Sequence, residues 1–171
     1  MTSSFVIERL SPEHDRRTFD CGDARLNHYL VQRASQDVRR RLANCFIAHE
    51  QHATTSVAGY YSLAAAGISI TDFPEELRRR LPQYPKVPAA LIGRLTVDLR
   101  FRGQGLGQVL LFDAVERVSS GDLAAVAVVV EAKDVAAADF YRHHEFQPLN
   151  NKPMTFFLTV ASFRGLNRKP R

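Results

Sequence analysis

A glycine-rich segment in the middle of the sequence has the residue types best suited to holding a ligand. It reads Arg102-Gly103-Gln104-Gly105-Leu106-Gly107 and lies between an expected strand, 90–99, and an expected helix, 106–118. Glycines let successive backbone N–H groups approach a ligand closely, and the N-terminus of a helix attracts negative charge. The segment could therefore cradle a pyrophosphate, although a glycine-rich turn standing alone is more often only a tight turn.

Two well-known nucleotide-binding motifs do not fit this segment. A nucleotide-hydrolysing loop would end in Gly-Lys-Ser or Gly-Lys-Thr, whereas Gly107 is followed by Gln108 and Val109. A dinucleotide-binding unit would need Gly-x-Gly-x-x-Gly spacing and a second strand–helix–strand half, and the sequence shows neither. The sequence therefore disfavours both nucleotide hydrolysis and dinucleotide binding.

Positive charge in this chain is carried mainly by arginine. The sequence has 23 lysine and arginine residues, with lysine only at 86, 133, 152 and 169, against 18 acidic residues, which gives a net charge of +5. The planar guanidinium fork suits phosphate better than the point charge of lysine. Clusters at 39–41, 78–80, 94–102 and 164–171 favour an acidic partner such as a nucleic acid, and solvated helix faces explain the same clusters equally well.

The periodicity of apolar residues predicts α/β (α+β) layers around one mixed sheet. Strands are expected over 6–10, 45–48, 57–62, 90–99, 124–130 and 154–163. Helices are expected over 23–42, from Pro74, over 106–118 and over 135–144, the last capped by Asp134. The glycine-rich segment therefore joins a strand to a helix.

Length and composition predict one globular domain over 1–171 with a basic tail at 164–171. No apolar run approaches the roughly 20 residues that a membrane helix needs, and no apolar signal segment opens the chain, so a cytoplasmic protein without membrane contact is expected. Cys21 and Cys45 lack metal-ligand spacing and are expected to be buried or semi-buried thiols. Surface positions and no metal are expected for the histidines, which are His14, His28, His49, His52, His143 and His144.

Several segments together resemble a known family. Arg102-x-x-Gly105-x-Gly107, in its strand–turn–helix setting, is similar to the acyl-CoA pyrophosphate loop of the GNAT superfamily of N-acetyltransferases. The segments 129–134 and 138–141 with Phe146 resemble the family's fifth strand, the following helix and the return strand. The segments 19–22, 26–30, 59–63 and 91–98 resemble, in particular, acetyltransferase toxins of bacterial toxin–antitoxin pairs, and the likeness covers most of residues 5–163.

The resemblance implies a GNAT fold and a cosubstrate. The expected sheet is mixed and mostly antiparallel, with about six to seven strands splayed in the middle and about four flanking helices. The cosubstrate is acetyl-CoA, and no metal is implied. The residues that the resemblance assigns to its binding are Leu95, Thr96, Val97, Arg102, Gly103, Gln104, Gly105, Leu106, Gly107 and Phe140.

The resemblance also assigns Tyr141 as the catalytic acid. A phenol with a pKa near 10 is protonated at pH 7 and can donate to a thiolate whose conjugate acid has a pKa near 8.5. On the residues alone, the favoured interpretation of Tyr141 is a core aromatic packed against Phe140 and Phe146. Glu131 could relay the proton of the amine through water, or simply be the exposed residue of its strand. Where the family usually has glycine this chain has Glu145, which must adopt a left-handed conformation or end the helix differently.

The toxin resemblance implies an acceptor and partners. The acceptor is the amino group of the aminoacyl moiety on a charged tRNA, whose acetylation blocks translation. The partners are a ribbon-helix-helix antitoxin, operator DNA bound only through the antitoxin complex, and a second copy in a homodimer. Residues expected near the tRNA or the amine are Arg39, Arg40, Arg78, Arg94 and Glu131.

Two alternatives stay open at this stage. One is a GNAT enzyme that acetylates a protein N-terminus or a small amine such as a polyamine or an aminoglycoside. The other is a catalytically idle GNAT fold that serves as a binding module.

Overall fold

The computed structural model describes residues 4–167, which belong to two compact units. The first unit comprises 1–64 and 93–114, and the second comprises 65–92 and 115–171. The described strands are β1 (Phe5–Arg9), β2 (Asn44–Glu50), β3 (Gly59–Ser69), β4 (Lys86–Val97), β5 (Ala127–Glu131), β6 (Gln147–Leu149) and β7 (Lys152–Thr159). The described helices are α1 (Ala24–Gln32), α2 (Ala34–Arg39), α3 (Glu75–Arg78), α4 (Leu106–Ser120), α5 (Val135–His143) and α6 (Val160–Asn167), with 3₁₀ turns η1 (Ile70–Asp72) and η2 (Leu99–Phe101).

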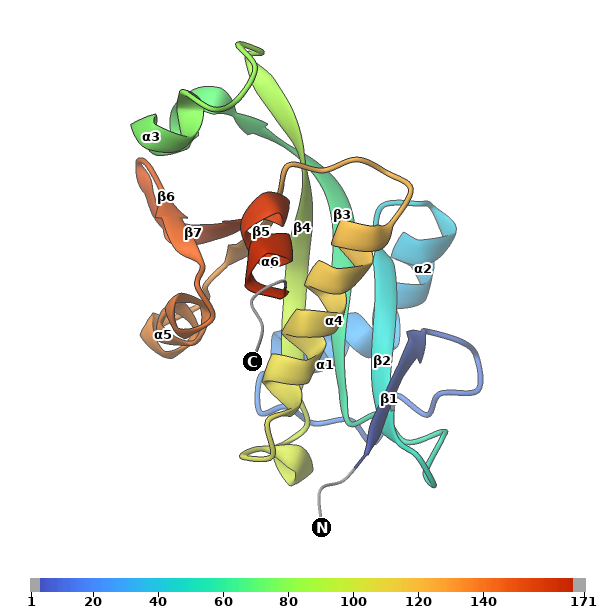
Figure 1. Cartoon of the computed structure of the whole chain (residues 1–171). Coiled ribbons are helices and arrows are strands. Elements are labelled where there is room, and N and C mark those ends of the chain that lie inside the picture. Colours follow the sequence, from blue (N-terminus) through green and yellow to red (C-terminus); the bar gives the residue numbers. More distant parts are fainter. Residues whose placement is uncertain (1–3, 168–171) are drawn as a thin grey trace. The chain divides into compact units, whose positions relative to one another are not determined.

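The strands form one mixed sheet in the order β1-β2-β3-β4-β5-β7-β6 (Figure 1). The pairs β1–β2, β2–β3, β5–β7 and β6–β7 are antiparallel, and β4–β5 is parallel. This arrangement confirms the expected mixed, mostly antiparallel sheet. Within the described range, none of the helices is both long and apolar enough to cross a bilayer.

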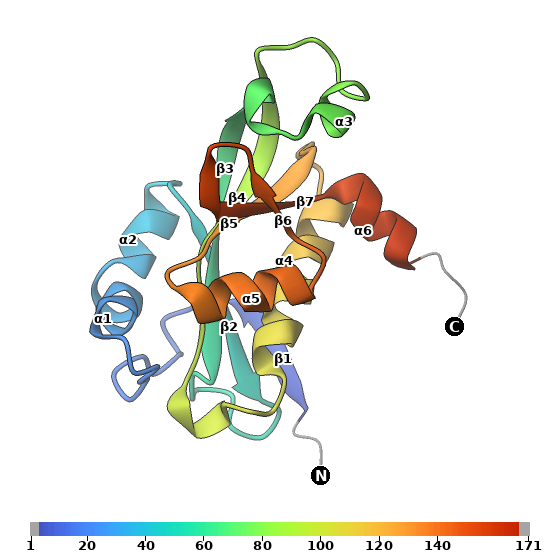
Figure 2. The ribbon, with the colours of Figure 1, turned by 90° about the vertical axis from the view of Figure 1, so that its left-hand side faces the viewer.

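In the first unit, α1 and α2 lie on one side of β2 (Figure 2) and bury a shared apolar cluster. Asp23 caps α1 by accepting the N–H of Arg25 at 3.0 Å, and Tyr29 and Leu30 of the helix enter the cluster. The expectation of one helix over 23–42 is wrong, because the chain breaks at Arg33, whose φ of −120° and ψ of −34° lie outside the helical range. The apolar spacing continues across the break, so periodicity could not reveal it.

In the second unit, the core forms where β5 and β7 meet. The run Ala127–Val130 is buried on every residue, as its continuous apolar sequence predicts, and Phe157 of β7 packs edge-to-face on Phe73 at 5.2 Å between ring centroids. The expected strand over 154–163 is wrong in its second half. Thr159 Oγ1 accepts the N–H of Ser162 at 3.1 Å, and this cap starts α6 immediately after β7.

The described chain has six α-helices where about four were expected. The break at Arg33 divides one expected helix into two, and α6 replaces an expected stretch of strand. In Figure 2, α5 and α6 both lie against β7.

Candidate active site

The end of β4 carries the residues expected to bind the pantetheine arm. The pairing of β4 with β5 runs from Ala89↔Ala127 to Ile92↔Val130, and β4 continues beyond it to Val97. Its last residues, 95–97, are half-buried and hold an extended conformation. A strand segment that runs past its paired neighbour can accept main-chain hydrogen bonds from an added extended ligand.

Gly59 brings β3 close to this end of β4. A Cβ at Gly59 would lie 3.0 Å from the Thr96 carbonyl oxygen, 3.0 Å from Leu110 Cδ1 and 3.3 Å from Leu106 Cδ2. Only glycine fits without displacing the strand or the start of α4. The glycine of the sequence motif 59–63 therefore serves close packing beneath the expected donor site.

The glycine-rich turn has the backbone that its composition predicts. Gly103 and Gly105 have φ values of +76° and +77°, and no atom lies within 4 Å of where their Cβ atoms would be. Leu106 is buried and opens α4 directly after the turn. The turn thus presents glycine backbone to open space at a helix N-terminus, which is the geometry of an anion site.

The side chain of Arg102 points back into the first unit. Its Nη2 donates a 2.6 Å hydrogen bond to the backbone carbonyl of Cys21. The guanidinium is therefore tethered at the start of the turn through one of its five N–H donors.

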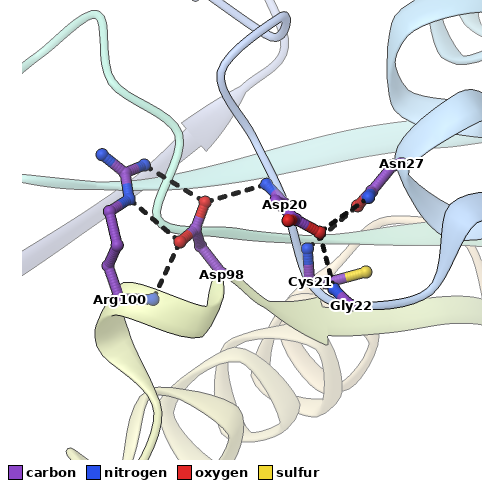
Figure 3. A network of polar contacts seen from close by, with 6 residues as sticks. All are labelled: Asp20, Cys21, Gly22, Asn27, Asp98 and Arg100. Atoms are coloured by element: carbon purple, nitrogen blue, oxygen red, sulfur yellow. Dashed lines mark hydrogen bonds and ion pairs between the residues drawn. The ribbon is translucent and has the colours of Figure 1, made fainter.

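Asp98, directly after β4, is the centre of a polar network next to the turn (Figure 3). Its carboxylate is buried and accepts the backbone N–H of Asp20 at 3.0 Å and that of Arg100 at 2.9 Å. Arg100 adds two side-chain bonds, at 2.9 and 3.1 Å. Burial alone would raise the pKa of Asp98, but the hydrogen bonds from Arg100 and Asp20 outweigh it, and the pKa lies below its usual value of 3.8.

Tyr141, the expected acid, lies on α5 in the second unit. The residue is 7% exposed, and its ring lies against Phe140, Phe146 and Phe156 at centroid distances of 5.3, 5.8 and 6.4 Å. Burial raises the pKa of the phenol to about 12. Tyr141 is therefore a packed aromatic that keeps its proton throughout the physiological range.

The C-terminus of α5 shows how the chain manages without the family's glycine. Glu145 adopts φ +71°, its N–H donates to the carbonyl of Arg142, and the N–H of Phe146 donates to the carbonyl of Tyr141, both at 3.1 Å. This is a Schellman ending with its usual apolar contact, here between Tyr141 and Phe146. Of the two outcomes expected for Glu145, the left-handed conformation is the one observed.

The other expected site residues are distributed over both units. Two of the expected segments lie in the first unit. Residues 95–97 form the end of β4, and the turn 102–107 follows β4 after η2. In the second unit, Phe140 is half-buried beside Tyr141, and Glu131 is exposed at the end of β5, as a strand's outward polar residue would be.

The arginines expected to contact RNA have different environments. Arg39 and Arg40 are exposed at the end of α2. The guanidinium of Arg94 lies 3.5 Å from the ring centroid of Tyr29, whose hydroxyl donates to Asp37 at 2.9 Å. Arg78 has a buried Nε with no hydrogen-bond partner in the described part of the chain.

The basic tail is only partly described. Arg164 donates to the hydroxyl of Ser119 at 3.0 Å and to the carbonyl of the same residue, which ties α6 to the end of α4. Arg168, Lys169 and Arg171 lie outside the described residues.

Sequence reasoning missed a cluster in which two buried histidines, His14 and His49, contact the exposed carboxylate of Glu8. The two histidines are 4% and 3% exposed, so the expectation of surface positions is wrong for them. Both Nε2 atoms face Glu8 Oε1, at 2.9 and 3.1 Å. The signal lay in the sequence, because His49 interrupts the apolar run of β2 and its strand partner is Val6, two residues from Glu8.

The hydrogen bonds of this cluster do not suit a metal ion. His14 Nδ1 accepts the N–H of Ser11 at 3.0 Å, so its Nε2 must carry a proton and cannot be a ligand. His49 Nδ1 faces the carbonyl of Glu50 at 2.8 Å and acts as a donor. One carboxylate oxygen of Glu8 on β1 therefore holds the ring of His49 on β2 and the ring of His14 in the segment that follows β1.

The fold and the glycine-rich turn together define an acyl-CoA-dependent acetyltransferase, and comparison with known proteins agrees. The family model described as the acetyltransferase (GNAT) domain matches residues 86–156. "Probable toxin TacT" of Sinorhizobium fredii is 32% identical over 171 residues, covering 94% of this chain and 94% of the relative. A "tRNA-acetylating toxin" of Mycobacterium tuberculosis is 32% identical over 168 residues, covering 97% and 98%. The chain belongs to the GNAT acetyltransferases.

Solved structures show the same relationship. AtaT complexed with acetyl-methionyl-tRNAfMet is 28% identical, with a TM-score of 0.89 and coverage of 96% of this chain and 99% of AtaT. Related AtaT structures contain acetyl-CoA, the C-terminus of the antitoxin AtaR, or AtaR with DNA.

Proposed function

We propose that this chain transfers the acetyl group of acetyl-CoA to the amino group of the aminoacyl moiety on charged tRNA and thereby blocks translation. The observation that carries the proposal is the turn after β4, where two left-handed glycines face open space at the start of α4. This geometry suits the pyrophosphate of CoA. The acceptor follows from the relatives, because the chain aligns over 97% of its length with a tRNA-acetylating toxin.

The acyl donor is held by the end of β4 and the turn. Leu95, Thr96 and Val97 offer main-chain groups to the pantetheine arm, and one of their N–H groups polarises the thioester carbonyl. The turn 102–107 binds the pyrophosphate, and Phe140 contributes an apolar surface from α5.

The reaction needs an amine, a polarised thioester and a stabilised leaving group. The amine nitrogen attacks the thioester carbonyl carbon, the new C–N bond forms, and the C–S bond breaks to release the CoA thiolate. Tyr141 stabilises the thiolate as a hydrogen-bond donor that keeps its phenolic proton, and the proton lost by the amine leaves to solvent.

The amine needs no dedicated base. A free α-amino group titrates near 7.7 to 8.0, and an aminoacyl ester lowers this value further, so a large fraction is neutral at pH 7. Glu131 is exposed and fits a water-mediated relay at most.

The RNA is held by arginine through its phosphates. These residues are Arg39 and Arg40 at the end of α2, Arg78 in the last turn of α3, and Arg94 on β4, and they supply charge without base-specific geometry. The predicted binding is tolerant of sequence and sensitive to salt.

The partners and setting complete the proposal. The chain acts in the cytoplasm as a homodimer, is neutralised by a ribbon-helix-helix antitoxin, and contacts operator DNA only through that complex. The two compact units act as one acetyltransferase domain over 1–171, since β3 and β4 each contribute residues to both. AtaT bound to its antitoxin AtaR, and the AtaT–AtaR complex bound to DNA, support the antitoxin and DNA parts of this proposal.

The test is transfer of label from acetyl-CoA to total charged tRNA, with uncharged tRNA and Tyr141→Phe as controls. Label on charged tRNA alone supports the proposal and allows the aminoacyl group to be identified. Turnover with peptides or polyamines but not with tRNA moves the chain to the small-amine or protein acetyltransferases. Binding of acetyl-CoA without any turnover indicates an idle binding module.

A further inference from the structure

The segment Asp20–Gly22 is held by an unusual number of side-chain contacts for a surface loop. The N–H of Asp20 donates to Asp98, that of Cys21 to Asn27 Oδ1 at 2.9 Å, and that of Gly22 to Asp20 Oδ1 at 2.8 Å. Asn27 Nδ2 also donates to Asp20 Oδ1 at 2.9 Å. Three consecutive backbone N–H groups are thus fixed by three different side chains (Figure 3).

The segment is also aligned with the chain after β4. The N–H of Leu99 donates to the carbonyl of Asp20 at 2.9 Å, and Asp98 lies directly before Leu99. Both backbone groups of Asp20 are therefore held at this point. Its N–H donates to the Asp98 side chain, and its carbonyl accepts the N–H of Leu99. Gly22, at φ +83°, lets the chain turn away immediately afterwards.

The backbone carbonyl of Cys21 connects this segment to the glycine-rich turn. The carbonyl of Cys21 belongs to the same planar peptide unit as the N–H of Gly22, which Asp20 holds, and it accepts the 2.6 Å bond from Arg102 Nη2. A long arginine side chain loses rotamer freedom when it binds an anion, and prior tethering removes part of that cost. The network therefore restricts the rotamer freedom of the Arg102 side chain at the start of the turn.

We propose that Asp98 is a positioning residue for the acyl donor: it holds the backbone of Asp20, and through the segment Asp20–Gly22 it fixes the Cys21 carbonyl that orients the Arg102 guanidinium toward the CoA pyrophosphate. The inference rests on the proposed use of the turn 102–107 for CoA. It assigns a purpose to the motif Phe19-Asp20-Cys21-Gly22, which lies far from the turn in sequence and is joined to it by hydrogen bonds.

The test is a double-mutant cycle read by calorimetric titration with CoA, which requires no acceptor. Asp98→Asn and Arg102→Gln are each expected to raise the Kd for CoA by about three- to tenfold, the scale of one immobilised side chain. Because Asp98 acts through Arg102, the double variant is expected to bind CoA as Arg102→Gln does, within about twofold. Thermal melting of each variant separates this effect from loss of fold.

Two further variants keep the test decisive. Asp72→Asn, which removes a carboxylate paired with Lys152 in the second unit, is the matched control and should leave the Kd unchanged. If Asp98→Asn fails to fold, Asn27→Ala removes the bond to Cys21 from the same network and should give the same Kd pattern. Multiplying effects in the double variant, or an unchanged Kd in Asp98→Asn, would overturn the inference. If the unaltered protein does not bind CoA, the proposed function itself fails.

Discussion

Replacing Tyr141 with phenylalanine tests what the tyrosine does for the leaving thiolate. The pKa of Tyr141 is raised by burial to about 12. A thiol such as that of CoA has a pKa near 8.5, so complete proton transfer from phenol to thiolate is uphill by about 3.5 units, or roughly 5 kcal/mol. We therefore expect Tyr141 to stabilise the departing sulfur as a hydrogen-bond donor that largely retains its proton.

This reasoning sets the size of the effect. A hydrogen bond to a charged group contributes about 1.5 to 3 kcal/mol, which corresponds to roughly 10- to 150-fold in kcat. Tyr141→Phe should lose that factor and keep its affinity for acetyl-CoA, because the ring contacts with Phe146 and Phe156 remain.

The assay is CoA release at saturating acetyl-CoA across pH 6 to 10, with Tyr84→Phe, an exposed tyrosine, as the control. The wild type and Tyr141→Phe should give parallel pH profiles, because a phenol with a pKa of about 12 does not titrate in that range. A fall in kcat that occurs only in the wild type, with an apparent pKa below 10, would refute the reasoning. A loss smaller than about threefold would remove Tyr141 from the mechanism.

Three further predictions concern stability and RNA. Glu145→Gly should raise the free energy of unfolding by about 1 kcal/mol, because glycine removes the left-handed strain. The melting temperature should rise by about 2–4 °C. Asn151→Gly, at φ +62°, should raise it less, since asparagine tolerates that conformation. The hydrogen bond from His14 lowers the pKa of Glu8, so this stabilisation is present above the unfolded pKa near 4.5 and is lost as pH falls through the folded value. The melting temperature of the wild type should therefore drop more steeply between pH 5 and 3 than that of Glu8→Gln. Arg39→Gln with Arg40→Gln should weaken tRNA binding and reduce the slope of log K against log salt by about 0.7 to 0.9 for each phosphate that the protein no longer neutralises, and an unchanged slope would exclude α2 from the RNA surface.

Local chemistry in the sequence predicted most of the site's backbone. The turn 102–107 is legible because its glycines, its preceding strand and its following helix all require the same strand–turn–helix geometry. The left-handed Glu145 was one of the two helix endings that the sequence left open, because no local signal chose between them.

Features that depend on contacts between residues far apart in the sequence could not be predicted from local patterns. The tether from Arg102 to Cys21 spans 81 positions, and no local pattern indicates which carbonyl a long side chain will reach. The burial of His14 follows from its partner on β1, not from its polar neighbours in sequence. The break at Arg33 is hidden because apolar spacing continues through it, whereas the start of α6 had a readable cap in Thr159 and Ser162 that the apolar run of β7 obscured.

The burial of both cysteines has a practical consequence for measuring turnover. Cys21 and Cys45 are 1% and 2% exposed, and burial raises the pKa of Cys45 to about 12, so the native fold offers almost no thiolate to a disulfide reagent. Colour from such a reagent during catalysis therefore reports the thiol of released CoA with little background from the enzyme. Without substrate, the slow reaction of the reagent with Cys21 and Cys45 would report local opening of the first unit's core. One reagent can therefore follow both acetyl transfer and local unfolding.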